Sequence, residues 1–274
     1  MNDMKHKIIE INGNTIHYYV SGKESGETIV FLHPAFGDHR CFDKQIDFFS
    51  QDYQVITLDM LGHGLTGVGK SKDKLIDTAM HIAEILKVEN KDKLHIIGVS
   101  LGSLLAQDFA LKYPDKILSL TALGGYNINK EQKEIAKAQG KEIFKWMFKM
   151  IFSMDSFHKY VAKVSAINPA EQIRAYESAK HFSRKSFAVM SGLNKLMANR
   201  IVQRNFPLLI LVGEKDTELS IKAAKQWFKD ELTNSNLAII KNAGHCANMD
   251  NAEDFNNIVK SFISGKPINS NSND

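Results

Sequence analysis

The pentapeptide Gly-Val-Ser-Leu-Gly at residues 98–102 constrains the fold of this 274-residue chain more than any other feature. The apolar run before the serine, residues 94–99, is typical of a buried strand, and residues 101–110 are typical of a helix. So sharp a strand-to-helix turn forces its serine into a strained backbone conformation, and bulky neighbours would collide with the adjoining strand and helix. We therefore expect the hydroxyl of Ser100 to stand above the sheet edge, close to the N–H groups that begin the helix.

Strand-like and helix-like patterns alternate along the chain on both sides of one long helical segment. The first pattern is a hairpin, in which residues 7–11 and 15–20 flank Asn12-Gly13. From residue 126 to residue 205 the apolar spacing is helical throughout. This order predicts an α/β fold with a mostly parallel, doubly wound sheet and a helical cap. The other predicted strands are residues 28–32, 53–59, 94–99, 117–123, 207–212 and 237–240, and the other predicted helices are 75–88, 101–110, 221–229 and 254–263.

The helical segment also differs from the rest of the chain in charge. Residues 130–204 hold 15 lysines and arginines against 6 aspartates and glutamates, a net charge of +9, whereas the whole chain carries +4. Such a split predicts a distinct subdomain. We therefore expect a core made of residues 1–125 and 206–265, a helical cap at 126–205 and a flexible polar tail at 266–274.

The composition argues against several classes of protein. Two cysteines, Cys41 and Cys246, are too few for a disulfide framework or a zinc cluster, and a reduced, cytoplasmic setting is expected. Residues 1–7 are polar and no apolar run approaches about 18 residues, so neither a secretory signal nor a transmembrane helix is predicted. No arginine-rich run, zinc motif or aromatic RNA-binding pattern is present, so no nucleic-acid partner and no metal are expected.

Three segments, taken in order, resemble the α/β-hydrolase superfamily, and the resemblance covers nearly the whole chain. The sharp strand-to-helix turn around Ser100, which the family calls the nucleophile elbow, comes first in the chain, as it does in the family. Residues 208–216 resemble the family's strand that ends in Gly-x-x-Asp, which makes Asp216 the acid, with Glu214 as the alternative. Residues 242–245 resemble the loop after the last strand, which makes His245 the base. The resemblance implies the eight-stranded α/β-hydrolase fold and a Ser-His-Asp triad.

The family resemblance also implies two backbone donors for an oxyanion. One is the N–H of Leu101, directly after the nucleophile. The other belongs to the turn after His33, where Pro34 replaces the family's usual glycine and has no N–H to donate. The matching donor is therefore Ala35, with Phe36 as the second choice.

Two loop motifs lie between residues 59 and 71. The stretch from Asp59 to Thr66 resembles the family's Asp-x-x-Gly-x-Gly-x-Ser segment, and we expect Asp59 and His63 to hold this loop rather than to catalyse. Residues 64–71 match the phosphate-binding pattern Gly-x-x-x-x-Gly-Lys-Ser, and residues 62–67 match a dinucleotide pattern. Nucleotide binding is the weaker interpretation, because polar residues follow Ser71 where a phosphate loop normally opens a buried helix.

The cap segment at residues 141–152 combines large apolar side chains with a lysine stripe. We expect its apolar residues to form, with Phe36, the wall of an acyl pocket. Two alternatives remain: the segment binds an anionic membrane surface, or it simply buries one face on the core. The lysines further suggest a substrate that is apolar but carries negative charge. The expected pocket residues on this segment are Phe144, Met147, Phe148 and Ile151, and the stripe consists of Lys141, Lys145 and Lys149.

These features predict a serine hydrolase without a cofactor. We interpret it as a carboxylesterase that cleaves small to medium acyl esters, a small-molecule substrate, through an acyl-enzyme on Ser100. The same triad also supports a thioesterase, a lactonase, a carbon–carbon hydrolase or a cofactor-free perhydrolase, and the same fold can serve as a ligand sensor. Cys246, which follows the base His245, is interpreted as a small buried residue and not as a catalytic thiol.

Overall fold

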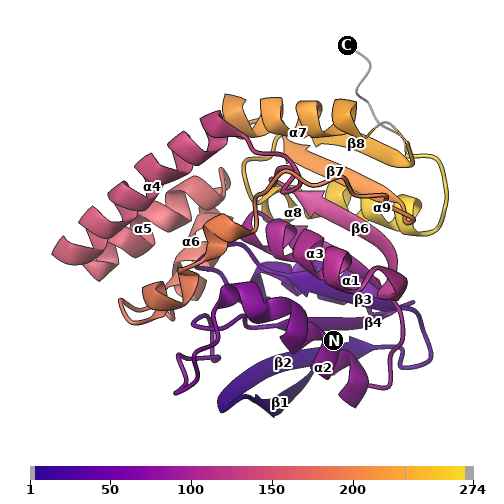
Figure 1. Ribbon diagram of the computed structural model, residues 1–274, viewed down its shortest axis with the longest axis horizontal. Coiled ribbons are helices and arrows are strands. Elements are labelled where there is room, and N and C mark those ends of the chain that lie inside the picture. Colours follow the sequence, from indigo (N-terminus) through magenta and orange to yellow (C-terminus); the bar gives the residue numbers. More distant parts are fainter. Residues whose placement is uncertain (1–3, 232, 269–274) are drawn as a thin grey trace.

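An eight-stranded sheet forms the centre of the protein in the computed structural model, which describes residues 4–231 and 233–268. The strand order is β1-β2-β4-β3-β5-β6-β7-β8 (Figure 1). Residues 269–274 of the predicted flexible tail lie outside the described residues, and Ile268 before them packs against the core. The strands are β1 Lys5–Ile11, β2 Asn14–Gly22, β3 Thr28–Leu32, β4 Gln54–Leu58, β5 Leu94–Val99, β6 Ile117–Leu123, β7 Leu208–Gly213 and β8 Ser235–Ile240.

Most of the sheet is parallel, as the sequence predicts. β1 pairs with β2 and β2 with β4 in antiparallel fashion, and every pair from β4 to β8 is parallel. The central strands β3, β5 and β7 are buried along their whole length, because helices cover both of their faces. The β1–β2 hairpin turns at Asn12 and Gly13, whose φ angles of 51° and 78° are those of a type I′ turn.

Helices cover both faces of the sheet. α2, α3 and α7 pack on one face, and α1, α8 and α9 pack on the other. The sequence did not predict α1, because seven residues are too few to show a helical period; Ile46 and Phe49 anchor it to the core. The helices outside the insertion are α1 Asp43–Phe49, α2 Thr78–Val88, α3 Leu101–Lys112, α7 Glu218–Asp230, α8 Ala247–Asp250 and α9 Ala252–Ile263.

The long connection between β6 and β7, residues 124–207, contains helices and irregular loops but no strand. The helices are α4 Lys133–Phe152, α5 Met154–Ser165 and α6 Pro169–Ala179, followed by two short 3-10 turns. Figure 1 shows these helices gathered at one side of the sheet. A separate apolar cluster, in which Phe36 of the core meets Met150, Phe157 and Phe182 of the insertion, joins the two parts. None of the helices in the two described ranges is both long and apolar enough to cross a membrane.

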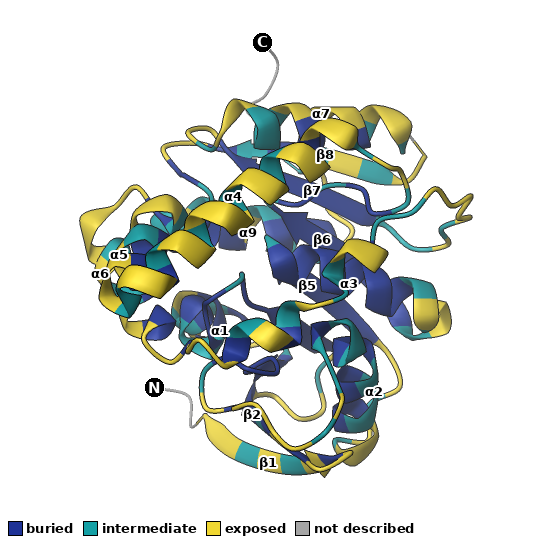
Figure 2. Cartoon of the chain, turned by 60° about the vertical axis from the view of Figure 1, so that its left-hand side comes forward, coloured by how far each residue is buried: buried dark blue, intermediate teal, exposed yellow. Residues whose placement is uncertain are grey.

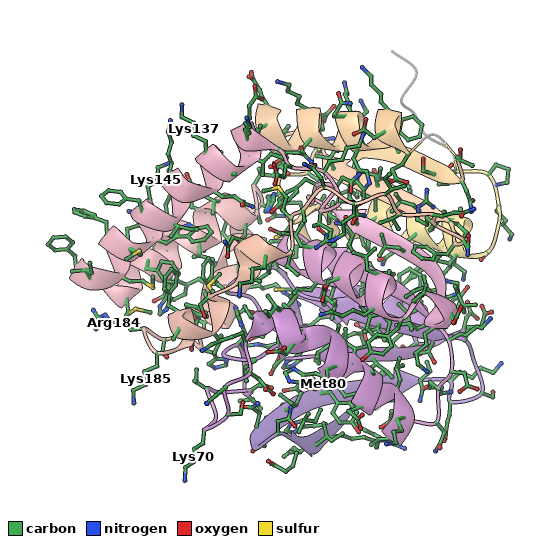
Figure 3. The ribbon with its side chains drawn as sticks, in the orientation of Figure 1. Lys70, Met80, Lys137, Lys145, Arg184 and Lys185 are labelled. Carbon is green, nitrogen blue, oxygen red and sulfur yellow. The ribbon has the colours of Figure 1, made fainter. Side chains whose placement is uncertain are left out.

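The segment that matches a phosphate-binding loop does not have the geometry of one. Residues 67–74 run as irregular backbone, and the next helical residues are a 3-10 turn at Leu75–Asp77. Ser71 Oγ accepts a 2.6 Å hydrogen bond from Asn14 of the hairpin, and Lys70 is exposed and points away from the protein (Figure 3). Lys70 and Ser71 therefore do not open a helix, as they do in a phosphate-binding loop.

Candidate active site

Ser100 occupies the turn between β5 and α3, and its backbone is strained. Its φ and ψ angles of 52° and −116° lie in a region that residues other than glycine rarely adopt. The Ser100 N–H donates to the Leu123 carbonyl at 2.8 Å, and the Ser100 carbonyl accepts from the N–H of Ser103 at 2.9 Å. These bonds hold the turn in place, so the surrounding structure stabilises the strained conformation.

Two glycines make this turn possible for steric reasons. A Cβ atom on Gly102 would lie 2.1 Å from the carbonyl oxygen of Leu32, and one on Gly98 would lie 2.3 Å from the carbonyl oxygen of Gly102. Backbone atoms cannot move aside at these distances. The elbow therefore brings α3 closer to β3 and β5 than any side chain would allow, as the sequence pattern predicts.

Three side chains from distant parts of the chain form one line of hydrogen bonds. Ser100 Oγ lies 2.8 Å from His245 Nε2, and His245 Nδ1 lies 2.9 Å from Asp216 Oδ2. Since an ionised carboxylate can only accept, Nδ1 carries the imidazole proton and Nε2 is free to accept the serine proton. The arrangement has the geometry by which a histidine activates a serine hydroxyl.

The two candidate acids lie in the loop after β7 and have different hydrogen-bond partners. Asp216 points at His245, and its Oδ1 accepts from the N–H of Thr217 at 2.7 Å. Glu214 is exposed, and its carboxylate accepts from the N–H of Asn242 at 2.9 Å and pairs with Lys241 at 3.2 Å. Glu214 therefore holds the neighbouring loop, and only Asp216 is placed to orient the imidazole.

The pair formed by Asp216 and His245 shifts both pKa values toward the charged forms. Burial alone raises the pKa of Asp216, but the hydrogen bond and charge of His245, together with hydrogen bonds from Thr217 and Ser220, outweigh it, and the pKa lies below its usual value. Burial alone lowers the pKa of His245, and Asp216 outweighs that effect, so the pKa lies above 6.5. The carboxylate thus stabilises the imidazolium that forms when the histidine takes a proton.

This shift predicts how activity depends on pH. Protonated Nε2 cannot accept the serine proton, so kcat/KM for an ester is expected to fall about tenfold per pH unit below the pKa of His245 and to level off above it. The midpoint is expected above 6.5, because Asp216 raises this pKa. Titration of the released acid between acidic and mildly alkaline pH measures the profile. Activity that rises toward acidic pH would contradict the assignment of His245 as the base.

The turn after β3 places Ala35 in the wall of the cavity that Ser100 also lines. The N–H of Gly37 donates to the Pro34 carbonyl at 3.1 Å and closes a turn in which Phe36 has a φ of 67°. This positive φ is uncommon for a bulky residue; Trp146, Phe157 and Phe182 hold the Phe36 ring edge-on at 4.8 to 5.0 Å. Ala35 and Leu101 both line the cavity above Ser100, where two oxyanion donors are needed.

A cavity of about 660 Å³ opens above Ser100, between the sheet and the insertion. Its walls come from the elbow, from α4 and from residues 187–197, and they are mostly apolar. The polar lining residues are Ser100, Tyr126, Gln139, Ser191 and Asn194, and none of the residues that the structure places in this wall is charged. Such a cavity fits an uncharged, largely apolar molecule of moderate size.

The expectation that Phe144, Met147, Phe148 and Ile151 line this pocket is wrong. All four side chains are exposed, with Phe144 71% exposed. α4 is apolar on two faces, and it turns the other one inward: Ala136, Gln139, Gly140, Ile143 and Trp146 contribute to the cavity. Phe36 also fails as a pocket residue, because its ring is buried in the aromatic cluster with Phe157 and Phe182.

Tyr126 and Gln139 form a polar contact in the cavity wall that the sequence did not reveal. The Gln139 amide donates to the Tyr126 hydroxyl at 2.7 Å, and burial raises the pKa of this tyrosine. The hydroxyl proton is therefore free to bond a substrate oxygen. No local motif marks the two residues, since one follows β6 and the other lies in α4.

Asp250 links the histidine loop to the insertion, and no sequence signal identified it. Its carboxylate accepts from the N–H groups of Gly244 at 2.8 Å and of Asn168 at 2.9 Å. Gly244 directly precedes His245, so this carboxylate positions the loop that carries the base. The neighbouring Cys246 is buried, and burial raises the pKa of its thiol well above the usual value. Its thiol is therefore unreactive, and the side chain serves to pack the core.

Asp59 and His63 hold their loop, in agreement with the sequence analysis. Asp59 is buried and accepts from the side chain of His39 at 2.8 Å and from the N–H of Leu65 at 2.8 Å. Burial lowers the pKa of His63 to about 3, so its ring is neutral. Asp38, His39 and Asp59 lie close enough to share a metal ion, but Arg40 already neutralises Asp38 and His39 already bonds Asp59.

Known proteins resemble this chain over most of its length. The (E)-2-((N-methylformamido)methylene)succinate hydrolase of Acinetobacter baylyi is 23% identical over 272 residues, which cover 93% of this chain and 97% of that protein. The 3-oxoadipate enol-lactonase 1 of the same organism is also 23% identical, covering 94% of this chain and 97% of that protein. A carboxylesterase structure from Nitrososphaera gargenis superimposes with a TM-score of 0.81 at 18% identity, covering 94% of this chain and 98% of that one.

Residues 27–153, which carry the elbow, match the family described as the alpha/beta hydrolase fold. This segment contains β3, β4, β5 and β6, the parallel centre of the sheet, together with α4. The family match, the near full-length relatives and the strand order of the eight-stranded sheet all indicate the same fold. The protein therefore has the α/β-hydrolase fold.

Proposed function

We propose that this protein is a serine carboxylesterase that hydrolyses uncharged acyl esters. The observation that carries the proposal is the line of hydrogen bonds from Asp216 through His245 to Ser100, which ends at a cavity of about 660 Å³. A serine hydroxyl is a poor nucleophile unless a base within hydrogen-bond reach removes its proton. His245 Nε2 is such a base, and Ser100, to which it bonds, lines a cavity large enough for an ester.

The reaction proceeds in two balanced steps. In the first, Ser100 Oγ forms a bond to the acyl carbon, its proton passes to His245, and the imidazolium then gives that proton to the departing alcohol. In the second, His245 takes a proton from water as the hydroxyl adds to the acyl-enzyme, and the proton returns to Oγ as the carboxylic acid leaves. Asp216 stays ionised throughout and stabilises the imidazolium.

The developing oxyanion is assigned to the backbone N–H groups of Ala35 and Leu101. Leu101 is the first residue of α3, so its N–H has no partner within the helix. Ala35 reaches the same cavity from the turn after β3. A donor of this kind contributes roughly 3 kcal/mol to transition-state stabilisation in serine hydrolases.

The cavity lining favours an uncharged substrate, and this replaces the expectation of an anionic one. The lysines that suggested negative charge are not among the lining residues, and Lys137 and Lys145 point outward from α4 (Figure 3). A carboxylate in this apolar cavity would lose its hydration without gaining a cation. The two relatives named above carry succinate and oxoadipate in their names, so we expect this chain to differ from them in substrate.

The test is a comparison of matched esters. We expect kcat/KM for p-nitrophenyl butyrate to exceed that for p-nitrophenyl hemisuccinate by about a hundredfold, because leaving a carboxylate unpaired in the cavity costs about 3 kcal/mol. A butyryl thioester and γ-butyrolactone, tested beside them, identify the bond that is cleaved.

Three outcomes contradict parts of the proposal. Preference for the hemisuccinate would reject the uncharged substrate class but leave the esterase in place. Preference for the thioester or the lactone would show that the enzyme is a thioesterase or a lactonase and not a carboxylesterase. Saturable binding of these compounds without turnover of any would favour a ligand sensor.

A further inference from the structure

The outward side of α4 is apolar although it faces solvent. Phe144, Ile151 and Phe152 are 71%, 68% and 72% exposed, and Figure 2 shows the helix as mostly exposed along its length. The Phe148 and Phe152 rings lie 4.6 Å apart and contact each other. Single exposed apolar residues are ordinary. Aromatic residues that recur every four positions along one side of a helix form a contiguous apolar surface, which favours binding to a partner. We call Phe144, Met147, Phe148, Ile151 and Phe152 the outer face of α4.

Basic side chains border this outer face on one side. Lys137, Lys141 and Lys145 repeat every four residues, and the first and last project from the helix into solvent (Figure 3). Lys145 pairs with Glu142, and Glu134 pairs with Lys222 of α7. Lys137 and Lys141 have no ion-pair partner among the residues that the structure describes. The border is therefore positively charged, with Glu142 and Glu134 as the acidic groups on the same helix.

A further cation lies where α4 ends. The Arg184 guanidinium donates to the carbonyls of Met150 at 2.8 Å and of Ile151 at 3.4 Å. Lys185 beside it is exposed and points away from the protein (Figure 3). A cation at a helix C-terminus stabilises the last turn, so the exposed aromatic end of α4 is well held.

We propose that the outer face of α4 binds the surface of an anionic lipid bilayer. A helix with aromatic and aliphatic residues on one side and lysines at the border lies in the plane of such a surface, with its apolar side among the acyl chains and its lysines at the headgroups. Charge complementarity selects this occupant. A second copy of the chain, paired through the same face, would bring two lysine borders together and would be repelled.

The opposite side of the same helix lines the cavity above Ser100. Gly140, Ile143 and Trp146 contribute to that wall, while the outer face points the other way. One helix thus separates the cavity from the proposed lipid surface. This arrangement explains why α4 is apolar on two faces, a pattern that burial of a single face does not require.

Vesicle sedimentation tests the proposal. Ser100→Ala protein is used alongside the natural chain, so that the result does not depend on hydrolysis. Both are expected to sediment with vesicles of 70% phosphatidylcholine and 30% phosphatidylglycerol, to stay in solution with pure phosphatidylcholine, and to be released by high salt, which screens charges beyond about 3 Å at 1 M.

Two variants and two matched controls assign the surface. The triple change of Lys137, Lys141 and Lys145 to Gln is expected to weaken binding about a hundredfold, since each lysine near an anionic leaflet contributes about fivefold. The same change at the exposed Lys70, Lys72 and Lys93 removes equal charge and is expected to weaken binding by much less. Phe144→Ser with Phe148→Ser is expected to abolish binding, whereas Ile8→Ser with Val88→Ser, also exposed, is expected to leave it intact.

Several results would overturn the proposal. One is failure to bind anionic vesicles, and another is equal loss of binding in the two triple-lysine variants, which would indicate net charge without a specific face. Sedimentation velocity of the same proteins tests the alternative that a second copy of the chain binds this face. A dimer that dissociates in the Phe144→Ser, Phe148→Ser variant would show that this face binds a second copy.

Discussion

Replacing Ser100 with alanine is expected to lower kcat for p-nitrophenyl butyrate by about 10⁵- to 10⁶-fold. The change removes the nucleophile and leaves His245 without the hydroxyl that lies 2.8 Å from its Nε2. The remaining residues can still bind and polarise the ester, which accounts for a small residual rate above that in water. Because alanine fits the same turn with a smaller side chain, we expect the fold to persist, as circular dichroism can verify.

A fluorophosphonate probe gives a second measure of the same prediction. It is expected to add covalently to the natural chain, and peptide mapping is expected to find it on Ser100, because only an activated serine beside oxyanion donors reacts quickly. Ser264→Ala, an exposed serine just after α9, is the matched control and is expected to keep full labelling. Labelling that persists in Ser100→Ala would place the nucleophile elsewhere.

Asp216→Asn is expected to lower kcat by about 10⁴-fold while the fold remains intact. The carboxylate accepts from His245 Nδ1 at 2.9 Å and so keeps the imidazole in the tautomer that leaves Nε2 free. An asparagine amide can donate to Nδ1 instead, which favours the wrong tautomer, and it cannot stabilise the imidazolium. The measurement is the rate of ester hydrolysis, with thermal melting to confirm that the protein is folded.

Glu214→Gln is the matched control for this prediction. Glu214 is exposed and bonds Asn242 and Lys241, so its loss is expected to change kcat by less than about threefold, the range of surface changes away from a site. The pH profile separates the two residues further. Asp216→Asn removes the interaction that raises the pKa of His245, so the midpoint of any residual activity is expected to move to lower pH. A larger loss in Glu214→Gln would show that the acid was assigned to the wrong residue.

The sequence by itself determined the eight strands, their mostly parallel sheet and the turn that carries Ser100. These features follow from local physics: buried strands require continuous apolar runs, and the elbow requires glycines at positions 98 and 102, where a side chain would collide with the backbone. The seven-residue helix α1 escaped prediction, because it is too short to show a period and is held by the contacts of Ile46 and Phe49 with the core.

Tertiary structure decided which residues face which surroundings. α4 has two apolar sides, and periodicity cannot choose between them; the cluster around Phe36 accepts Trp146 and Met150, so Phe144 and Phe148 turn outward. The choice between Asp216 and Glu214 depended on where Asn242 and Lys241 lie, on a loop more than 25 residues later in the chain. The polar pair Tyr126 and Gln139 likewise exists only because α4 folds back over the end of β6. Local sequence specifies elements and motifs, whereas the side of a helix that meets a cavity is set by contacts between distant segments.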